Sequence, residues 1–301
     1  MPLPLPLYYY MAIAAVNILL SWAMYLPYRV AHLHFIVVAN MAISGYTAAY
    51  LVMNLHVPFG LALVAGFALG GIIGFIVSLF IGDAPTFAVV IVGFTFIFIT
   101  RTVIENLKAV GGALGMFGLP NIAATPGAHR WTMLAILYGL VLVVGFLIYR
   151  FDNSRLGRAA SAVFVDKELA ASLGVDIKKL GMLLQTFSCT IAGGIGVLYG
   201  FIYKSLYLTF FDFSLVGIAM TVIFVGGYAT QWGALVVAPI LYGVPLLFPP
   251  AIQSWRIVIY GALLILVLVL KPEGFLTRRF VYTLGSFLSG HRKNNNRQED
   301  I

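Results

Sequence analysis

The residues whose types could support polar chemistry gather in one stretch of this sequence, residues 150–180. This stretch holds six of the 18 Lys and Arg residues and four of the ten Asp and Glu residues, in a chain that is 61% hydrophobic and 9% charged. A segment this charged cannot lie in lipid, so we interpret it as an aqueous loop between membrane segments. Its basic bias predicts that the loop is cytoplasmic.

A short helix is predicted inside this loop, at about residues 167–173. Asp166 is a good N-cap residue, because its side chain can accept hydrogen bonds from the first backbone amides of a helix. Glu168 lies in the first turn, where a negative charge interacts favourably with the helix dipole. Gly174 is a natural C-terminal stop.

The faces of this predicted helix differ in bulk. Leu169 and Leu173 form an apolar stripe at i and i+4, whereas Ala170 and Ala171 leave a flank thin enough for another protein to pack closely. From the residues alone, two interpretations stay open: a solvated connecting loop, or a helix that docks on a partner protein.

Motifs for catalysis and cofactor binding are absent from the sequence. There is no Walker A pattern and no HExxH motif, so we expect neither ATP hydrolysis nor zinc-protease chemistry in this chain. Only His32 and His34 among the five histidines are close together, which is a weak metal signal. Ser188 has no neighbouring His or Asp at a triad spacing, and the single Cys189 gives no disulfide or Cys-based metal site. We predict no enzyme, no cofactor and no metal.

Around the polar stretch the chain consists of apolar runs, several of them long enough to cross a bilayer. We therefore predict an all-α fold, a polytopic transmembrane helical bundle of about eight spans, with the run at 213–227 rather short. No run has an acidic residue at its centre, which disfavours a proton- or sodium-coupled carrier. The apolar runs are 8–27, 35–54, 57–81, 86–104, 131–149, 181–203, 213–227, 233–248 and 257–270.

The distribution of Lys and Arg predicts the sidedness of the bundle. Twelve of the 18 basic residues lie in the 150–180 stretch and after Leu270, so topology accounts for the net charge of +8 and no nucleic acid is expected. We expect the N-terminus outside, the C-terminus inside and the loop at 105–130 outside. The predicted domains are a transmembrane domain at 1–280 and a polar, basic tail at 281–301.

Glycines recur along single helix faces in two of the runs. Small residues at such spacing let helix backbones approach closely in a membrane, so we interpret these glycines as packing residues rather than ligand-binding residues. The predicted packing residues are Gly66, Gly70, Gly74, Gly193, Gly196 and Gly200.

The loop at 105–130 has a different glycine pattern. Gly111, Gly112, Gly115 and Gly118, followed by Pro120, exclude a regular helix through its middle. Long loops without periodicity are usually functional or disordered. Because this one keeps apolar residues between its glycines, we expect it to be ordered.

Several of these motifs resemble permeases of ATP-binding-cassette importers. Residues 110–120 resemble the external TGGxxGxxGIP stretch of branched-chain amino acid permeases, with Val110 in place of the usual Thr. Residues 192–199, 213–233 and 261–275 are similar to three further stretches of that family, whereas before Gly111 only 44–48 matches. The cytoplasmic stretch resembles the EAA loop, which docks on the ATPase, in Gly157, Arg158, Ala159, Asp166, Glu168, Ala170, Ala171 and Gly174.

The resemblance implies a permease subunit in the cell (inner) membrane that imports branched-chain or neutral amino acids by ATP-driven alternating access. Its implied partners are a second permease subunit, two cytoplasmic ATP-binding subunits that hold the ATP, an extracytoplasmic solute-binding protein and the lipid bilayer. The EAA-like residues would couple the chain to the ATPase, and the four loop glycines would shape an external gate on the translocation path. The alternatives are a permease for urea or short amides, and a carrier or channel without an ATPase.

Overall fold

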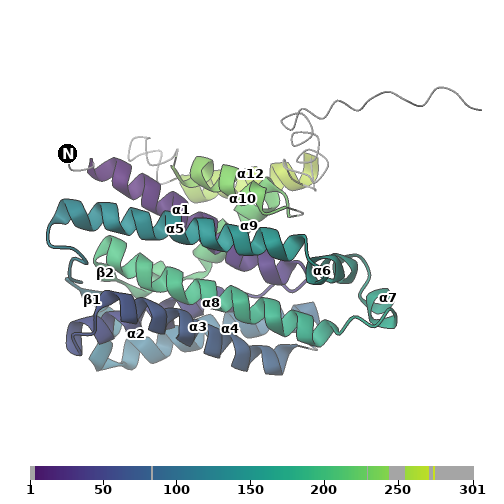
Figure 1. The fold of residues 1–301 in the computed structure, drawn as a ribbon, viewed down its shortest axis with the longest axis horizontal. Helices are drawn as coiled ribbons and strands as arrows, with labels where there is room; N and C mark the ends of the chain where they lie inside the picture. The colour runs from purple at the N-terminus through teal and green to yellow at the C-terminus, as the bar shows by residue number, and fades with distance from the viewer. Residues whose placement is uncertain (1–3, 83, 229, 244–254, 271–273, 275–301) are drawn as a thin grey trace, which may run out of the picture.

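The computed structural model describes residues 4–82, 84–228, 230–243, 255–270 and 274 (Figure 1). The predicted tail at 281–301 and the end of the predicted run at 233–248 lie outside the described residues. Seven described helical segments are long and apolar enough to cross a membrane. The prediction of an all-α, polytopic bundle is therefore confirmed.

The elements follow one another in an almost entirely helical order. They are α1 (Leu5–Tyr28), α2 (Ile36–Asn54), α3 (Phe59–Ile81), α4 (Thr86–Asn106), the 3-10 turns η1 (Lys108–Val110) and η2 (Gly112–Leu114), β1 (Met116–Phe117), α5 (Pro126–Asp152), α6 (Arg155–Val165), α7 (Lys167–Ser172), α8 (Ile177–Tyr203), β2 (Ser205–Leu206), the 3-10 turn η3 (Leu208–Phe210), α9 (Phe213–Gly226), α10 (Trp232–Ala238), the π-helical turn η4 (Pro239–Gly243) and α12 (Arg256–Leu270).

The long helices lie side by side, with α6 and α7 at one end of the bundle and the β1–β2 pair at the other (Figure 1). Helix α8 packs against α1, α2 and α3, and these contacts form the centre of the molecule. Most of α1, α2 and α8 is buried, whereas α3, α4 and α5 expose much of their apolar length. The exposed apolar surfaces of α3, α4 and α5 are suited to contact with lipid.

Close contact between α3 and α8 depends on glycine at several positions. A Cβ atom added to Gly193 would overlap the carbonyl oxygen of Gly66 and lie 3.0 Å from the Cα atom of Gly70. A Cβ atom on Gly74 would lie 3.1 Å from Cys189 Sγ. The backbones at these positions therefore approach more closely than side chains would allow.

The other two predicted packing glycines of α8, Gly196 and Gly200, have different neighbours. A Cβ atom on Gly196 would lie 2.7 Å from the carbonyl carbon of Met41 in α2, and one on Gly45 would lie 2.8 Å from the Gly196 oxygen. Gly200 instead faces β2, because a Cβ atom added to it would lie 3.0 Å from the side chain of Leu206. Gly196 thus lies at a helix–helix contact and Gly200 at the contact of α8 with the strand pair.

Two buried polar side chains join the central helices. Asn40 Nδ2 donates hydrogen bonds to the carbonyl oxygens of Gly70, at 3.1 Å, and Cys189, at 2.8 Å, and so connects α2 with α3 and α8. Ser188 Oγ donates to the carbonyl oxygen of Ala23 in α1. Hydrogen bonds of this kind between membrane helices each contribute about 0.6–2 kcal/mol.

The loop at 105–130 is irregular through its glycine-rich part. Gly111, Gly112, Gly115 and Gly118 have φ angles of 83°, 57°, 84° and 74°, which other residues rarely adopt. Strand β1 in this loop pairs antiparallel with β2, and the Gly118 amide donates to the Lys204 oxygen at 3.1 Å. The loop is therefore held against the C-terminal end of α8.

The polar stretch is more helical than the sequence predicts. The expected short helix is present as α7, but α6 precedes it, and α5 and α8 extend into both ends of the stretch. Ser154 caps α6 by accepting a hydrogen bond from the Gly157 amide at 3.2 Å. Helix α6 was missed because the residues on its buried face are Gly157, Ala160 and Val163, only one of which is large and apolar.

The sidedness of the membrane segments stays a prediction. Termini on opposite sides require an odd number of spans, so the expected orientation is incompatible with a count of eight. The orientation places the glycine-rich loop outside and α7 inside. Figure 1 has these two segments at opposite ends of the bundle, as that orientation requires.

Cysteine labelling tests this orientation directly. Cysteines introduced at Ala113 and Ala123 are expected to react with a membrane-impermeant thiol reagent added outside intact cells. The native Cys189 is completely buried, so the unmodified chain should stay unlabelled and serves as the control. Labelling of Ala113→Cys only after the cytoplasmic side is made accessible would reverse the proposed topology.

Candidate functional site

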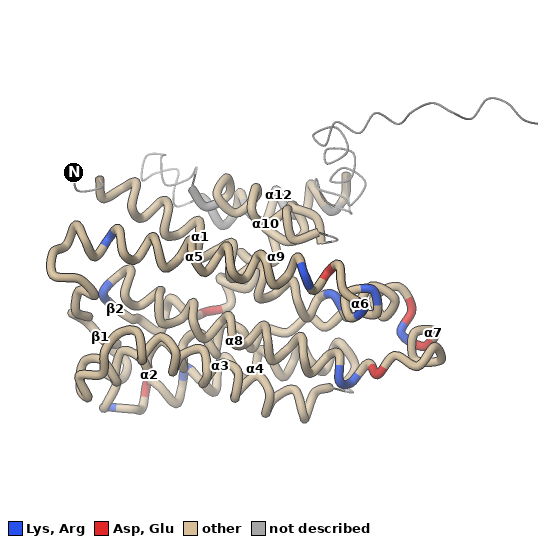
Figure 2. Tube along the Cα trace, in the orientation of Figure 1, with Lys and Arg blue, Asp and Glu red and all other residues tan. Residues whose placement is uncertain are grey.

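The charged residues of the described chain are densest around α6 and α7 (Figure 2). Helix α7 projects beyond the ends of the membrane helices in this view (Figure 1). Its N-cap is Asp166, whose Oδ1 accepts hydrogen bonds from the amides of Glu168, at 3.0 Å, and Leu169, at 2.9 Å. Gly174 has a φ angle of 85°, which ends the helix after six residues, fewer than two turns.

Apolar side chains are exposed on this polar projection. Leu169 is 56% exposed and Leu173 is 74% exposed, and Val165 at the end of α6 is 86% exposed. Large apolar side chains that gather on an aqueous surface mark an interaction site. The exposed face of α7 is thus a candidate docking surface for a protein.

The predicted coupling residues divide into two groups. Arg158, Asp166, Glu168, Ala171 and Gly174 are exposed, whereas Gly157 and Ala170 are buried within the chain. A Cβ atom on Gly157 would lie 2.7 Å from the backbone carbonyl oxygen of Asp152, so glycine permits the tight turn from α5 to α6. Ala170 is 1% exposed and belongs to the main apolar core. Its small side chain therefore packs against this chain rather than against a partner.

A buried arginine connects this projection to the central helix α1. Arg29 Nη2 donates to Ser161 Oγ of α6 at 2.7 Å and to the Gly157 oxygen at 3.4 Å. Arg29 Nε lies 3.4 Å from Asp152 Oδ1, an ion pair whose geometry falls short of a hydrogen bond. Tyr25 in α1 donates to Asp152 Oδ2 at 2.9 Å. These residues, called here the Arg29 link, join α1, α5 and α6.

Two histidines, His32 and His34, follow Arg29 in the segment between α1 and α2. Burial lowers the pKa of His34 to about 3, so this side chain is neutral at physiological pH. Burial, with a smaller contribution from Lys167, also lowers the pKa of His32. Neither ring nitrogen of His34 has a hydrogen-bond partner among the described residues. Within those residues no three His, Cys, Asp or Glu side chains come together as a metal site would require.

Comparison with known proteins decides the family. The model of the family described as branched-chain amino acid transport system, permease component, matches residues 7–268. The chain belongs to this permease family. Membership also covers the N-terminal quarter, where the sequence motifs are weakest.

Individual relatives of this permease are distant. It is 24% identical over 277 residues to a protein of Methanocaldococcus jannaschii named probable branched-chain amino acid transport permease protein LivM, covering 81% of this chain and 75% of the relative. It is 25% identical over 264 residues to the high-affinity branched-chain amino acid transport system permease protein LivM of Escherichia coli, covering 78% of this chain. The match spans only 61% of that longer relative. No solved structure matches the permease.

The Arg29 link was not predicted as a functional feature. The sequence shows Arg29 only as one cation at the end of an apolar run, and Asp152 is one of several charges in the polar stretch. The available signal was opposite charge, because Arg29 and Asp152 follow the ends of two apolar runs on the same predicted side. Their separation of more than a hundred residues hides the pairing from any local pattern.

Proposed function

We propose that this chain is a transmembrane permease subunit of an ATP-driven importer for branched-chain or neutral amino acids in the cell (inner) membrane. Membership of the permease family supports the transport role. The names of the two relatives above support the class of substrate. A second permease subunit, two ATP-binding subunits and an extracytoplasmic solute-binding protein complete the proposed complex.

The observation that carries the proposed coupling is the exposed apolar face of α7 on a charged projection. Asp166 holds the first turn of α7 in shape, and Gly174 ends the helix before it reaches α8. A short, capped helix of this kind can enter a cleft on an ATP-binding subunit without unfolding. Glu168 at its N-terminal end would then pair with a basic residue of that subunit.

The Arg29 link would transmit the resulting motion into the membrane. When nucleotide-driven closure of the ATP-binding subunits displaces α7, α6 moves with it. Arg29 holds α6 to the end of α1 through Ser161 and Gly157, and Asp152 holds the end of α5 to the same point. Displacement of α6 therefore shifts α1 relative to the remaining bundle, which is the movement that alternating access requires.

Substitutions on α7 test the proposed coupling. The variant with both Glu168→Lys and Ala171→Trp is expected to reach the membrane normally, because both residues are exposed. A bulky side chain in a fitted contact costs about 1–3 kcal/mol, so binding of the ATP-binding subunits should weaken roughly tenfold or more. The measurements are co-purification of those subunits and their ATPase activity in the complex.

The matched control is Ala124→Trp, which places the same bulk on an exposed residue of the glycine-rich loop. This control should retain the ATP-binding subunits. If the ATP-binding subunits co-purify equally well with the α7 double variant, α7 is a solvated connecting segment and the proposed coupling is wrong.

A further inference from the structure

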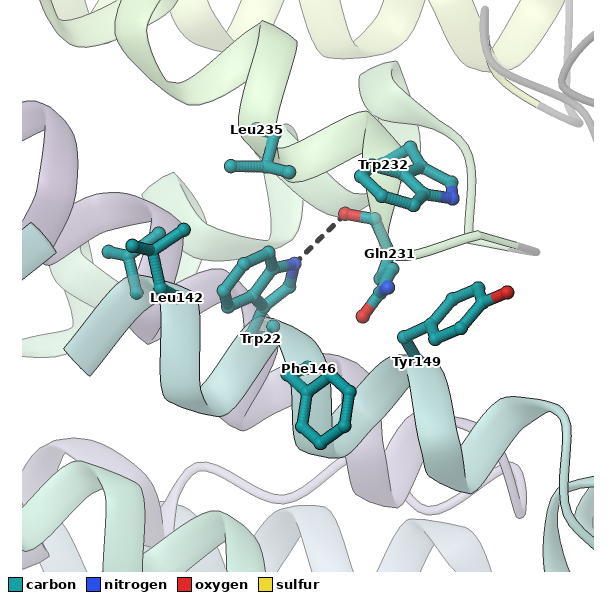
Figure 3. A pocket seen from close by; sticks show the side chains of 9 residues that line it. Trp22, Leu142, Phe146, Tyr149, Gln231, Trp232 and Leu235 are labelled. Carbon is teal, nitrogen blue, oxygen red and sulfur yellow. Dashed lines mark hydrogen bonds between the residues drawn. The ribbon is translucent and has the colours of Figure 1, made fainter. Parts of the chain in front are cut away.

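A groove on the bundle is formed by α1, α5, α10 and the residue before α10, Gln231 (Figure 3). Its volume is about 450 Å³, within the range of small-molecule sites. Most of its wall is apolar. The lining residues are Trp22, Val141, Leu142, Gly145, Phe146, Tyr149, Gln231, Trp232 and Leu235.

The groove is shaped by specific close contacts rather than by loose packing. A Cβ atom on Gly145 would lie 2.8 Å from the Trp22 ring, so glycine in α5 makes room for this side chain. Trp22 Nε1 donates to the Gln231 backbone oxygen at 2.9 Å and holds the segment before α10 against α1. Gly226 and Gly233 are in backbone contact, since a Cβ atom on Gly226 would lie 2.7 Å from the Gly233 carbonyl carbon. These contacts fix the position of Gln231.

The Gln231 side chain is the polar group of the groove. The residue is 4% exposed, and its carboxamide lies between Trp22, Phe146 and Tyr149 (Figure 3). The Oε1 atom has no hydrogen-bond partner among the described residues. A buried acceptor without a partner is unfavourable by about 1–3 kcal/mol. Such a group is explained if a donor from a ligand completes it.

We propose that this groove is a binding site for an α-amino acid with an apolar side chain. Once the buried Gln231 side chain turns into the groove, the ammonium group would donate to its Oε1. The apolar side chain would lie against the exposed Leu142 and Phe146, with the buried Trp22 beneath them. The Tyr149 hydroxyl and the Trp232 indole N–H are donors of the kind that the carboxylate needs. The choice of an amino acid rests on the proposed function, whereas the need for a hydrogen-bond donor rests on Gln231 alone.

A lipid acyl chain is the competing occupant, because Leu142, Phe146 and Trp232 are exposed on this subunit. An acyl chain would fill the apolar wall but has no donor for Gln231. Urea has donors but no apolar part to cover Trp22 and Phe146. An apolar amino acid satisfies both parts of the surface.

The position of the groove would connect it to the Arg29 link. Trp22 lines the groove, Tyr25 follows about one helical turn later on α1, and Arg29 is the C-cap residue of that helix. Likewise, Tyr149 of α5 lines the groove and Asp152 lies three residues further along in the link. A displacement of α1 against α5 by the link would therefore change the width of the groove.

Tryptophan fluorescence tests this proposal by direct binding. The chain has four Trp residues, and Trp131 and Trp255 are both exposed outside the groove. With these two changed to Phe and the partner subunits prepared without Trp, the assembled complex in lipid nanodiscs reports only on Trp22 and Trp232. Leucine is expected to shift the emission saturably. Isocaproate, which is leucine without its ammonium group, and urea are expected to give no shift.

Substitution of Gln231 separates ligand binding from folding. Gln231→Leu should weaken leucine binding by about tenfold, because a hydrogen bond to a charged group is lost. Its Tm should stay unchanged or rise, since the substitution removes a buried acceptor without a partner. Leucine binding of normal affinity in Gln231→Leu would overturn the proposal.

Two further measurements distinguish the competing outcomes. Leu142→Trp should fill the groove and prevent leucine uptake, whereas Leu147→Trp, at an exposed position of α5 outside the groove, should not. Quenching of Trp22 and Trp232 by brominated phosphatidylcholine that leucine fails to relieve would assign the groove to lipid. ATP-driven leucine uptake without any fluorescence response would refute the groove and leave the proposed function standing. A fluorescence response without ATP-driven uptake would support leucine binding in the groove and refute the proposed function.

Discussion

Arg29→Met is expected to destabilise the permease by up to about 3–5 kcal/mol, because the largely buried Asp152 carboxylate loses the Arg29 cation and keeps only its remaining partners, Tyr25 among them. The side chains of Arg29 and Asp152 are only 7% and 16% exposed, so solvent replaces little of the lost interaction. The hydrogen bonds to Ser161 and Gly157 are lost in the same variant. The change appears as a lowered Tm of the detergent-solubilised protein and as reduced ATP-driven uptake.

A second variant separates the stability of the Arg29 link from its role in transmission. Replacing a buried ion pair with apolar residues of similar volume is often neutral or stabilising. Arg29→Met combined with Asp152→Leu should therefore recover most of the lost Tm. Because α6 is then no longer held to α1 through polar contacts, uptake should stay low while ATP hydrolysis continues. An unchanged Tm in Arg29→Met would contradict the stabilising role of the Arg29 link, and full uptake in the double variant would contradict its role in transmission.

Gly196→Leu is expected to prevent α8 from packing against α2. Even a Cβ atom at this position would lie 2.7 Å from the Met41 carbonyl carbon, and backbone cannot move aside as a side chain can. Overpacking of a fitted contact costs about 1–3 kcal/mol and occasionally more. The expected result is a lower Tm and a smaller yield of assembled complex, measured by size-exclusion chromatography.

The matched control for this packing prediction is Gly139→Leu in α5. A Cβ atom on Gly139 meets no atom within 4 Å, so the same change of residue enters open space. Its Tm should stay close to that of the unmodified permease. Equal stability of the two variants would show that close approach at Gly196 is not required.

The sequence predicts well what depends on local patterns. Runs of apolar residues predict the membrane helices, because spanning a bilayer requires them irrespective of tertiary contacts. Asp166 and Gly174 predict the ends of α7, since capping involves neighbouring residues only. The positive φ angles of Gly111 and Gly115 agree with the expectation that no regular helix runs through that part of the loop, which holds only two short 3-10 turns.

Features that depend on distant contacts were not predictable. Ala170 and Ala171 are adjacent residues of the same type, yet Ala170 is buried and Ala171 is exposed. The packing of α7 on the bundle decides this difference. Gln231 follows a glycine-rich segment and appears as an ordinary loop residue until α1 covers it. The charge of Arg29 likewise suggested an aqueous residue before Asp152 was found beside it.

ATP-dependent uptake of radiolabelled leucine into proteoliposomes tests the central claim most directly. The vesicles would contain the permease with its partner permease and ATP-binding subunits, supplied with the solute-binding protein. We expect leucine to accumulate against its gradient only with ATP, and accumulation to be lost in the Glu168→Lys, Ala171→Trp double variant. Leucine flux of the same size without ATP, or undiminished accumulation by the double variant, would contradict an ATP-driven permease coupled through α7.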